Sequence, residues 1–347
     1  MARARKRPIP LTVVTGARGA GKTTLINRLL ADPAFANTAV ILNDFGATQL
    51  AAGVVSSSAT DGYIALGAGC VCCAVRGALS DSLEAMLRDL DNGRVAAIGR
   101  VVIEADETAD PAAIVLAIER HPYLSLRYAG DGIIAVVDGR TAEAVLASRA
   151  DAVGQVAVAD VVALTHGQND IVAIINPLAT VVDAATAPVS SFTGHGAFDP
   201  ASGNLDAWLA LPPAAIALTG EAARMRAFTI ERQAPMPLAA LDRFLDYLAA
   251  LIGPRLIKVR GAVRGDDGST VIVDGIGGSF RPPAIFEGRA GLGPRIRFLV
   301  VGRDLDPAMF DGYLAAFLNE ARADTPDREA IIANPLAIAG FSARRGR

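Results

Sequence analysis

The amino-acid sequence predicts an α/β domain with a mostly parallel sheet, followed by a smaller α+β domain. In the first half, short runs rich in valine and isoleucine alternate with segments of helical spacing, which is typical of parallel strands buried on both faces. A stretch rich in glycine, proline and small polar residues follows near 185–226. Beyond it, strands of alternating polarity accompany long apolar helices. This change of pattern indicates a second domain.

The strands expected in the first half are short and almost entirely apolar. They cover residues 11–16, 38–44, 100–106, 132–139, 159–167 and 178–184. A helix is expected at 22–32, where Leu25 and Leu29 fall on one side, and another at 76–90. Helical patterns between consecutive strands favour crossover connections and hence parallel pairing.

The second half predicts a different arrangement. Strands are expected at 226–233, 255–264, 269–278 and 295–303, and helices at 238–253 and 306–322. Helices and strands in this order favour a mostly antiparallel sheet with helices packed on it. The expected divisions of the chain are a basic tail at 1–7, a first domain at 8–200, a linker at 201–225, a second domain at 226–340 and a tail at 341–347.

One motif indicates the chemistry of the first domain. The stretch "GARGAGKT", Gly16 to Thr23, matches G-x-x-x-x-G-K-[ST] between an expected strand and an expected helix. Its glycines allow backbone N–H groups to face phosphate oxygens, with Lys22 reaching the β- and γ-phosphates and Thr23 holding Mg²⁺. A glycine-rich turn without a ligand is the competing interpretation, but the strand–helix context favours a phosphate loop. The first domain is therefore predicted to be an α/β P-loop NTPase domain.

A carboxylate at the end of a neighbouring strand is expected to orient Mg²⁺ and its waters. Glu104, in "VVIEADETADP", is the first candidate and Asp106 the second. A carboxylate that is merely solvated at the sheet edge is the alternative. Asp138 ends another strand and has the character of a turn residue rather than a ligand.

The cysteines are confined to one place. Cys70, Cys72 and Cys73 are the only three in the chain, and all lie in "GAGCVCCAVRG". Thiolates are soft ligands that favour Zn²⁺, Cu⁺ and, less strongly, Co²⁺ or Ni²⁺. The flanking glycines suit a bend that directs two of the thiols to one ion, while other ligands come from elsewhere. A buried apolar turn and a redox pair are the alternatives.

Charge and hydropathy argue against several classes of function. A formal net charge of -3 gives no electrostatic basis for binding nucleic acid or an anionic membrane. No apolar run approaches the roughly 20 residues of a transmembrane helix, and the basic start "MARARKR" lacks the apolar core of a signal peptide. Few, clustered cysteines suit a reducing compartment, so a cytoplasmic location is expected.

Several segments together resemble the CobW-like family of P-loop GTPases, whose members are regarded as metallochaperones or metal insertases. In the first half these are "VTGARGAGKTTLINRLL", "LNDFG", "GCVCCAVRGAL" and "EADETADP". The cysteine segment matches the family pattern Gly-Cys-x-Cys-Cys-x-x-Arg-x-x-Leu and is the most specific of them. Late in the chain, "RGAVRGDDGSTVIVDGIGGSF" and "FLVVGRDLD" resemble the family's C-terminal domain.

The resemblance implies a set of site residues. Lys22, Thr23 and Glu104 would act in catalysis, with Thr23 and Glu104 also near Mg²⁺. The nucleotide would be bound by Gly16, Gly19, Ala20, Gly21, Lys22, Thr23 and Thr24, with Thr165 and Gln168 at the base. Cys70, Cys72 and Cys73 would hold Zn²⁺ or Co²⁺.

Three positions depart from the family pattern. Glu107 stands where the family has a glycine whose N–H meets the γ-phosphate, and a carboxylate there is unfavourable unless it turns away or binds a cation. Leu42 replaces the first glutamate of the switch segment. The guanine-reading Asn-Lys-x-Asp is replaced by "THGQ", 165–168, in which Gln168 is a poorer acceptor than aspartate. Slow hydrolysis and a weakened base preference are expected.

The expected function is a nucleotide-dependent metallochaperone. With Mg²⁺ and GTP, ATP remaining open, it would bind a transition metal at the CxCC motif, deliver it to a client and hydrolyse the nucleotide slowly. The client would be a metalloprotein or a cofactor-biosynthesis enzyme, and the chain a monomer or homodimer. The alternative is a nucleotide- or metal-sensing switch that hydrolyses slowly or not at all. A small-metabolite kinase is a weaker alternative, because no general base is evident.

Overall fold

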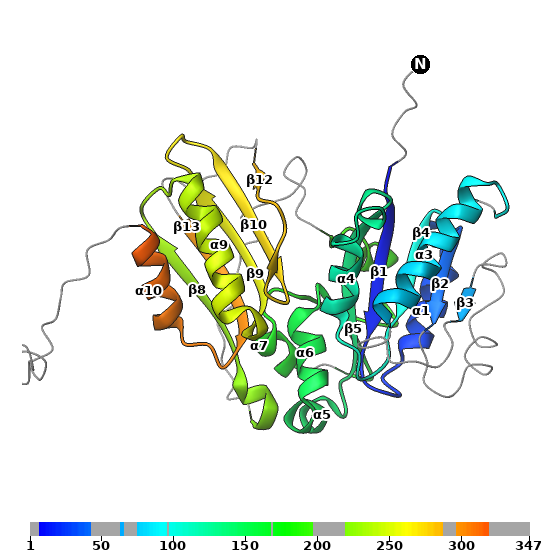
Figure 1. Cartoon of the computed structure of the whole chain (residues 1–347). Helices are drawn as coiled ribbons and strands as arrows, with labels where there is room; N and C mark the ends of the chain where they lie inside the picture. Colours follow the sequence, from blue (N-terminus) through cyan, green and yellow to red (C-terminus); the bar gives the residue numbers. More distant parts are fainter. Residues whose placement is uncertain are drawn as a thin grey trace, which may run out of the picture.

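The computed structural model describes residues 7–42, 63–65, 75–95, 97–167, 169–196, 219–286 and 296–318. Within these ranges the chain forms two β-sheets that lie side by side, with helices between them (Figure 1). The first sheet is parallel and the second is antiparallel. This confirms the predicted fold class.

The first sheet has seven strands in the order β3-β2-β4-β1-β5-β6-β7, and every pair is parallel. The strands are β1 (Ile9–Thr15), β2 (Thr38–Leu42), β3 (Tyr63–Ala65), β4 (Arg100–Glu104), β5 (Tyr128–Asp138), β6 (Val161–Thr165) and β7 (Thr180–Asp183). Each predicted run forms one of them, and only β3 lies outside those runs. Because parallel strands end at one edge, Val14 of β1 is level with Glu104 of β4.

Helices cover both faces of this sheet, which explains why most of its strand residues are apolar. One face carries α1 (Lys22–Leu30), whose Leu25 and Leu29 pack in a buried cluster with Val14. The other face carries α3 (Val75–Asp91), α4 (Pro111–Glu119), α6 (Ala150–Val158) and α7 (Ile171–Ile175), and α5 (Ala142–Ser148) precedes α6. Bounds were not predicted for α4 to α7, which have between five and nine residues each.

The second sheet has six strands in the order β11-β10-β9-β13-β8, with β12 paired to β10, and the described pairs are antiparallel. The strands are β8 (Met225–Arg232), β9 (Leu256–Arg264), β10 (Thr270–Ile276), β11 (Ser279–Phe280), β12 (Ala284–Ile285) and β13 (Ile296–Arg303). Helices α9 (Leu238–Ile252) and α10 (Pro307–Phe317) cover one face. Phe244 and Phe310 on these helices pack with Phe298 of β13.

The opposite face of the second sheet packs on the first domain. Ala262 of β9 and Leu299 of β13 belong to the same buried cluster as Val156 of α6. Helix α6 therefore lies between the two sheets (Figure 1). The two sheets share one apolar core across this contact.

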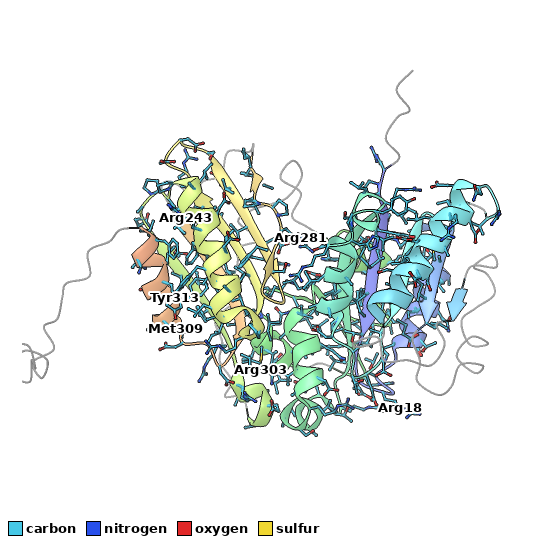
Figure 2. The ribbon with its side chains drawn as sticks, viewed as in Figure 1. Arg18, Arg243, Arg281, Arg303, Met309 and Tyr313 are labelled. Carbon is cyan, nitrogen blue, oxygen red and sulfur yellow. The ribbon has the colours of Figure 1, made fainter. Side chains whose placement is uncertain are left out.

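Charged side chains reinforce the junction. Lys258 of β9 is only 4% exposed, and its Nζ donates to Asp160 at 2.6 Å and to the carbonyl oxygen of Ala159 at 3.0 Å. Arg281, which lies between the sheets in Figure 2, donates to Glu119 of α4 at 2.8 Å. The contact between the domains is thus fixed by ion pairs as well as by apolar packing.

Over the described ranges, no helix combines the length and the apolar character needed to cross a membrane. The residue limits expected for the two domains and their linker stay predictions.

Candidate functional site

The predicted phosphate loop, 16–23, connects the end of β1 to the start of α1. Its glycines all have positive φ, with Gly16 at 141°, Gly19 at 79° and Gly21 at 105°. A Cβ on Gly16 would lie 2.3 Å from the carbonyl oxygen of Val136, closer than real Cβ atoms approach. The backbone therefore requires glycine here. The loop and the first turn of α1 together offer N–H donors suited to an anion.

Lys22, the first residue of α1, folds back over this loop. Its Nζ donates to the carbonyl oxygen of Gly16 at 2.8 Å and to that of Ala17 at 3.3 Å. The ammonium charge is thereby placed beside the N–H donors of the loop. Of the other predicted binding residues, Ala20 is buried and Thr24 is exposed on the first turn of α1.

Thr23 and Glu104 come together at the edge of the sheet. Thr23 Oγ1 donates to Glu104 Oε1 at 3.1 Å, from α1 to the end of β4. A hydroxyl and a carboxylate are hard oxygen ligands of the kind Mg²⁺ prefers, so this pair fits a magnesium site. Asp106 is engaged in a local turn, where its Oδ1 accepts from the N–H and the hydroxyl of Thr108 at 2.9 and 2.8 Å. The geometry favours Glu104 over Asp106.

Glu107 contacts the phosphate loop directly. Its Oε2 accepts the backbone N–H of Arg18 at 3.0 Å and Nη1 of Arg149 at 3.2 Å. Its backbone carbonyl accepts Nε2 of Gln155 at 2.9 Å. The negative charge of Glu107, which is unfavourable beside a phosphate loop, is thus offset by the Arg149 guanidinium. Sequence reasoning missed Arg149 and Gln155, which lie 42 and 48 residues from Glu107 in the chain and belong to no motif.

Arg149 is itself held by a second carboxylate. Its Nε donates to Asp151 Oδ1 at 3.1 Å. The hydrogen bond to Asp151, and to a smaller extent that to Glu107, raises the pKa of Arg149 above its ordinary value. A permanent positive charge therefore stands beside the phosphate loop.

A cavity of about 180 Å³ adjoins the loop on the side of α5 and α6. Its wall is formed by residues 16–20, the end of β5 and the two helices. Gln155 lies in this wall, and its Oε1 has no hydrogen-bond partner among the described atoms. The phosphate loop is therefore bordered on this side by a hollow rather than by tightly packed side chains.

The predicted base-reading segment is described only in part. Thr165 Oγ1 donates to the carbonyl oxygen of Ala20 at 2.9 Å, so this side chain braces the phosphate loop. His166 has φ of 52° and a side chain that is 57% exposed. Asp138 binds Arg140, and that hydrogen bond is the main cause that lowers the pKa of Asp138 to about 2. Asp138 thus behaves as the turn residue that the sequence indicates.

Several predicted site residues lie outside the described ranges. These are Cys70, Cys72, Cys73 and Gln168, together with the part of the switch segment that follows Leu42. In the part of the chain that the structure describes, no group of three His, Cys, Asp or Glu side chains is placed to hold a metal ion. His121 accepts the N–H of Leu124 and His195 contacts the carbonyl of Ser191, so both have local partners.

The first domain is similar to a known family of nucleotide-binding domains. Residues 10–171 match the family model described as "CobW/HypB/UreG, nucleotide-binding domain". The chain is 37% identical over 158 residues to the zinc chaperone YjiA of Escherichia coli (strain K12), which covers 46% of this chain and 49% of YjiA. It is 31% identical over 137 residues to the zinc-regulated GTPase metalloprotein activator 1 of Saccharomyces cerevisiae, which covers 38% of this chain and 31% of that protein. The chain thus spans about half the length of YjiA and less of the yeast protein.

The structural likeness extends further along the chain. The crystal structure of Zn(II)-bound YjiA GTPase from E. coli matches with a TM-score of 0.70 at 22% identity, covering 90% of this chain and 99% of that chain. A Zn(II)-bound triple mutant of the same protein gives a TM-score of 0.72. At this identity the likeness establishes the fold of both sheets. Through this match, residues 10–171 of this chain are similar to the nucleotide-binding domains of the CobW/HypB/UreG family.

Proposed function

We propose that the chain is a nucleotide-dependent metallochaperone. It binds a nucleoside triphosphate with Mg²⁺ at the phosphate loop, carries a transition metal at Cys70, Cys72 and Cys73, and delivers it to a client as the nucleotide is hydrolysed. The observation that carries the nucleotide part of the proposal is the contact of Thr23 with Glu104, beside a loop whose first residue, Gly16, has no room for a side chain. Relatives named as zinc chaperones and as a zinc-regulated GTPase support the same reading.

Each side chain has a distinct task in the nucleotide site. The loop N–H groups and Lys22 bind the phosphates and offset the charge that develops on them during hydrolysis. Thr23 and Glu104 would hold Mg²⁺, which would supply positive charge to offset that of the phosphates. GTP is the proposed nucleotide, because the relatives are named GTPases. Residues 165–168 differ from the family's guanine-reading motif, so the affinity for ATP should be measured beside that for GTP.

The metal cargo would be zinc, with cobalt as the second candidate. Thiolates suit Zn²⁺, and the curated relatives carry zinc in their names. In the sheet, Glu104, Leu42 and Ala65 are level on the neighbouring strands β4, β2 and β3. Adjacent strands are about 4.8 Å apart, so the chain leaves for the cysteines roughly 10 Å from the carboxylate that would sense Mg²⁺. The last described residue before the cysteines is therefore close to the carboxylate proposed to hold Mg²⁺.

The partners follow from the same proposal. The second domain would recognise a client metalloprotein or a cofactor-biosynthesis enzyme in the cytoplasm, with the chain acting as a monomer or homodimer. A switch protein that hydrolyses slowly or not at all is the second candidate. The contact of Glu107 with the phosphate loop favours it, because a carboxylate opposes a terminal phosphate there.

A metal competition titration tests the proposal. Reduced protein is titrated with Zn²⁺ or Co²⁺ against a chromophoric chelator, alone and with Mg·GTP, Mg·GDP or Mg·ATP. A Cys70/Cys72/Cys73→Ser variant is the control. Metal binding that tightens with one triphosphate, and that depends on the thiols, is expected. Affinity that ignores the nucleotide, or that survives loss of the thiols, contradicts the proposal.

A further inference from the structure

We infer that the Glu107 carboxylate is an internal competitor of the terminal phosphate, and that it sets the preference between nucleoside diphosphate and triphosphate. The inference rests on the proposed nucleotide site and adds to it a residue that determines which nucleotide binds. The Glu107 carboxylate is negatively charged, and the loop beside it is suited to bind negatively charged phosphate.

The first observation is the contact itself. Glu107 Oε2 accepts the N–H of Arg18 at 3.0 Å, and Arg18 is the third residue of the phosphate loop. N–H groups of such loops are donors for phosphate oxygens. A carboxylate oxygen has the charge and the acceptor geometry of a phosphate oxygen. Glu107 therefore occupies a donor that an anionic ligand would otherwise use.

The second observation is the side of the loop on which Glu107 lies. It follows Glu104 by three residues in the segment that leaves β4, and Glu104 contacts Thr23. Thr23 and Lys22 mark the end of the loop where Mg²⁺ and the β- and γ-phosphates bind. Glu107 thus reaches the loop from the side of the terminal phosphate. A nucleoside diphosphate has no terminal phosphate at this position. It can therefore bind without displacing the Glu107 carboxylate.

The third observation is that both ends of Glu107 are held. Its backbone carbonyl accepts Gln155 Nε2 at 2.9 Å, and Gln155 also donates to the carbonyl of Ala109 at 3.1 Å. Its carboxylate pairs with Arg149, which Asp151 holds in place. Contacts from Gln155 of α6 and from Arg149, the residue before α6, therefore hold Glu107 against the phosphate loop.

The consequence is a competition between like charges. A γ-phosphate that approaches Arg18 meets the carboxylate at short range, and it binds only when Glu107 has withdrawn. Withdrawal frees Nη1 of Arg149, while Asp151 still holds Nε, and guanidinium donors suit phosphate as well as carboxylate. Arg149 can then exchange Glu107 for the terminal phosphate. Diphosphate binding involves none of these steps.

The test compares nucleotide affinities of the full chain and its Glu107→Gln variant. Fluorescent analogues of GDP and of non-hydrolysable GTP, and their adenine counterparts, are titrated with Mg²⁺ present. Glu107→Gln is expected to raise triphosphate affinity about tenfold, or about 1.4 kcal/mol, while diphosphate affinity changes less than about threefold. Glu143→Gln, an exposed carboxylate on α5, is the matched control and should leave both affinities unchanged.

A second variant protects the test against a folding defect. Glu107→Ala removes the carboxylate outright and should move the ratio of the two affinities in the same direction. Arg149→Ala should move it the other way, because the carboxylate then faces the phosphate without its cation. An unchanged ratio in both Glu107 variants, with nucleotide still bound, overturns this inference alone. Failure of the unaltered chain to bind either nucleotide overturns the proposed function, and this inference with it.

Discussion

At the scale of single residues, the phosphate loop depends on backbone shape as much as on charge. Gly16 has a φ of 141° and lies against the backbone of β5. The motif predicted this requirement, because its fixed glycines have a known conformational purpose. It did not predict Arg149, whose contact with Glu107 exists only after α6 has packed against the segment that follows β4. Contacts of that kind leave no periodic trace in a sequence.

Gly16→Ala is expected to abolish nucleotide binding and to destabilise the fold by about 2 kcal/mol or more, because the new Cβ meets the Val136 carbonyl at a strained φ. Nucleotide titration and urea denaturation measure the two effects. Gly154→Ala is the matched control, since this glycine lies within α6 with open space at its Cβ position. The control should be neutral or stabilising by about 0.5–1 kcal/mol. Equal behaviour of the two variants contradicts the prediction.

Glu104→Gln and Asp106→Asn separate the two candidate carboxylates. Glu104→Gln should lower Mg²⁺-dependent hydrolysis about 10- to 100-fold, because a neutral amide is a poor partner for the ion. Asp106→Asn should change it less than about threefold, since the Asp106 side chain serves a local turn with Thr108. Steady-state phosphate release at several Mg²⁺ concentrations measures both. A larger loss in Asp106→Asn reverses the assignment.

Asp138 gives a prediction for pH. Its pKa is lowered to about 2 from 3.8, chiefly by the hydrogen bond from Arg140. A lowered pKa in the folded state stabilises the protein above 3.8, and this contribution is lost as the pH falls toward 2. Arg140→Ala should return the pKa toward 3.8 and reduce the loss of stability over that range. Carboxyl chemical shifts followed through an NMR titration measure it, with Arg120→Ala as the control. An unmoved titration in Arg140→Ala refutes the stated cause.

At the scale of elements, buried strands, helix α1 and the long helices were predictable, whereas the short helices α4 to α7 were not. The apolar runs at 100–106 and 159–167 form strands β4 and β6. They were predictable because parallel strands buried on both faces need apolar residues on both sides. Helix α4 begins with Asp110 accepting the N–H of Ala112 and with Pro111 at its first position, a common start signal for which no helix was predicted. Helices α5 and α7 have seven and five residues, and only tertiary packing fixes them. The placement of α6 between the sheets follows from that packing as well.

Lys258 ties β9 to the end of α6 and gives a prediction about that element. Lys258→Met keeps an apolar stem but leaves the buried Asp160 with Arg260 and the N–H of Ile133 as partners. The loss of one buried partner should destabilise the fold by about 3 kcal/mol. Urea denaturation measures this loss. Arg243→Met, on the exposed side of α9 in Figure 2, should change stability by less than about 0.5 kcal/mol. A loss below about 1 kcal/mol in Lys258→Met means that the ion pair adds little.

At the scale of the whole molecule, the two sheets are joined by a common core. Apolar residues of β9, β10 and β13 belong to the same buried cluster as those of α3, α4 and α6. The sequence predicted two domains but could not predict this contact, since each sheet looks complete by its own pattern. Neither domain can lose its structure without exposing part of the core of the other.

The chain is therefore expected to unfold in a single cooperative transition. Scanning calorimetry should give equal calorimetric and van't Hoff enthalpies, and a bound nucleotide should shift the whole transition upward. Two resolved transitions, of which only one moves with nucleotide, would show that the domains unfold independently. The same scan should be made on Lys258→Met, because a weaker contact between the domains should favour two separate unfolding transitions.

Strand β3, the described element before the cysteine segment in the chain, and the outer helices of the second domain lie at opposite ends of the molecule. Figure 1 places β3 and α3 at one end and α10 at the other. The chain leaves β3 at Ala65, and five residues of backbone keep Cys70 within about 18 Å of that point. Under the proposed function, a client that binds α9 and α10 while it receives the metal must extend across both sheets. For a small client, recognition and loading would be two separate encounters with the same carrier.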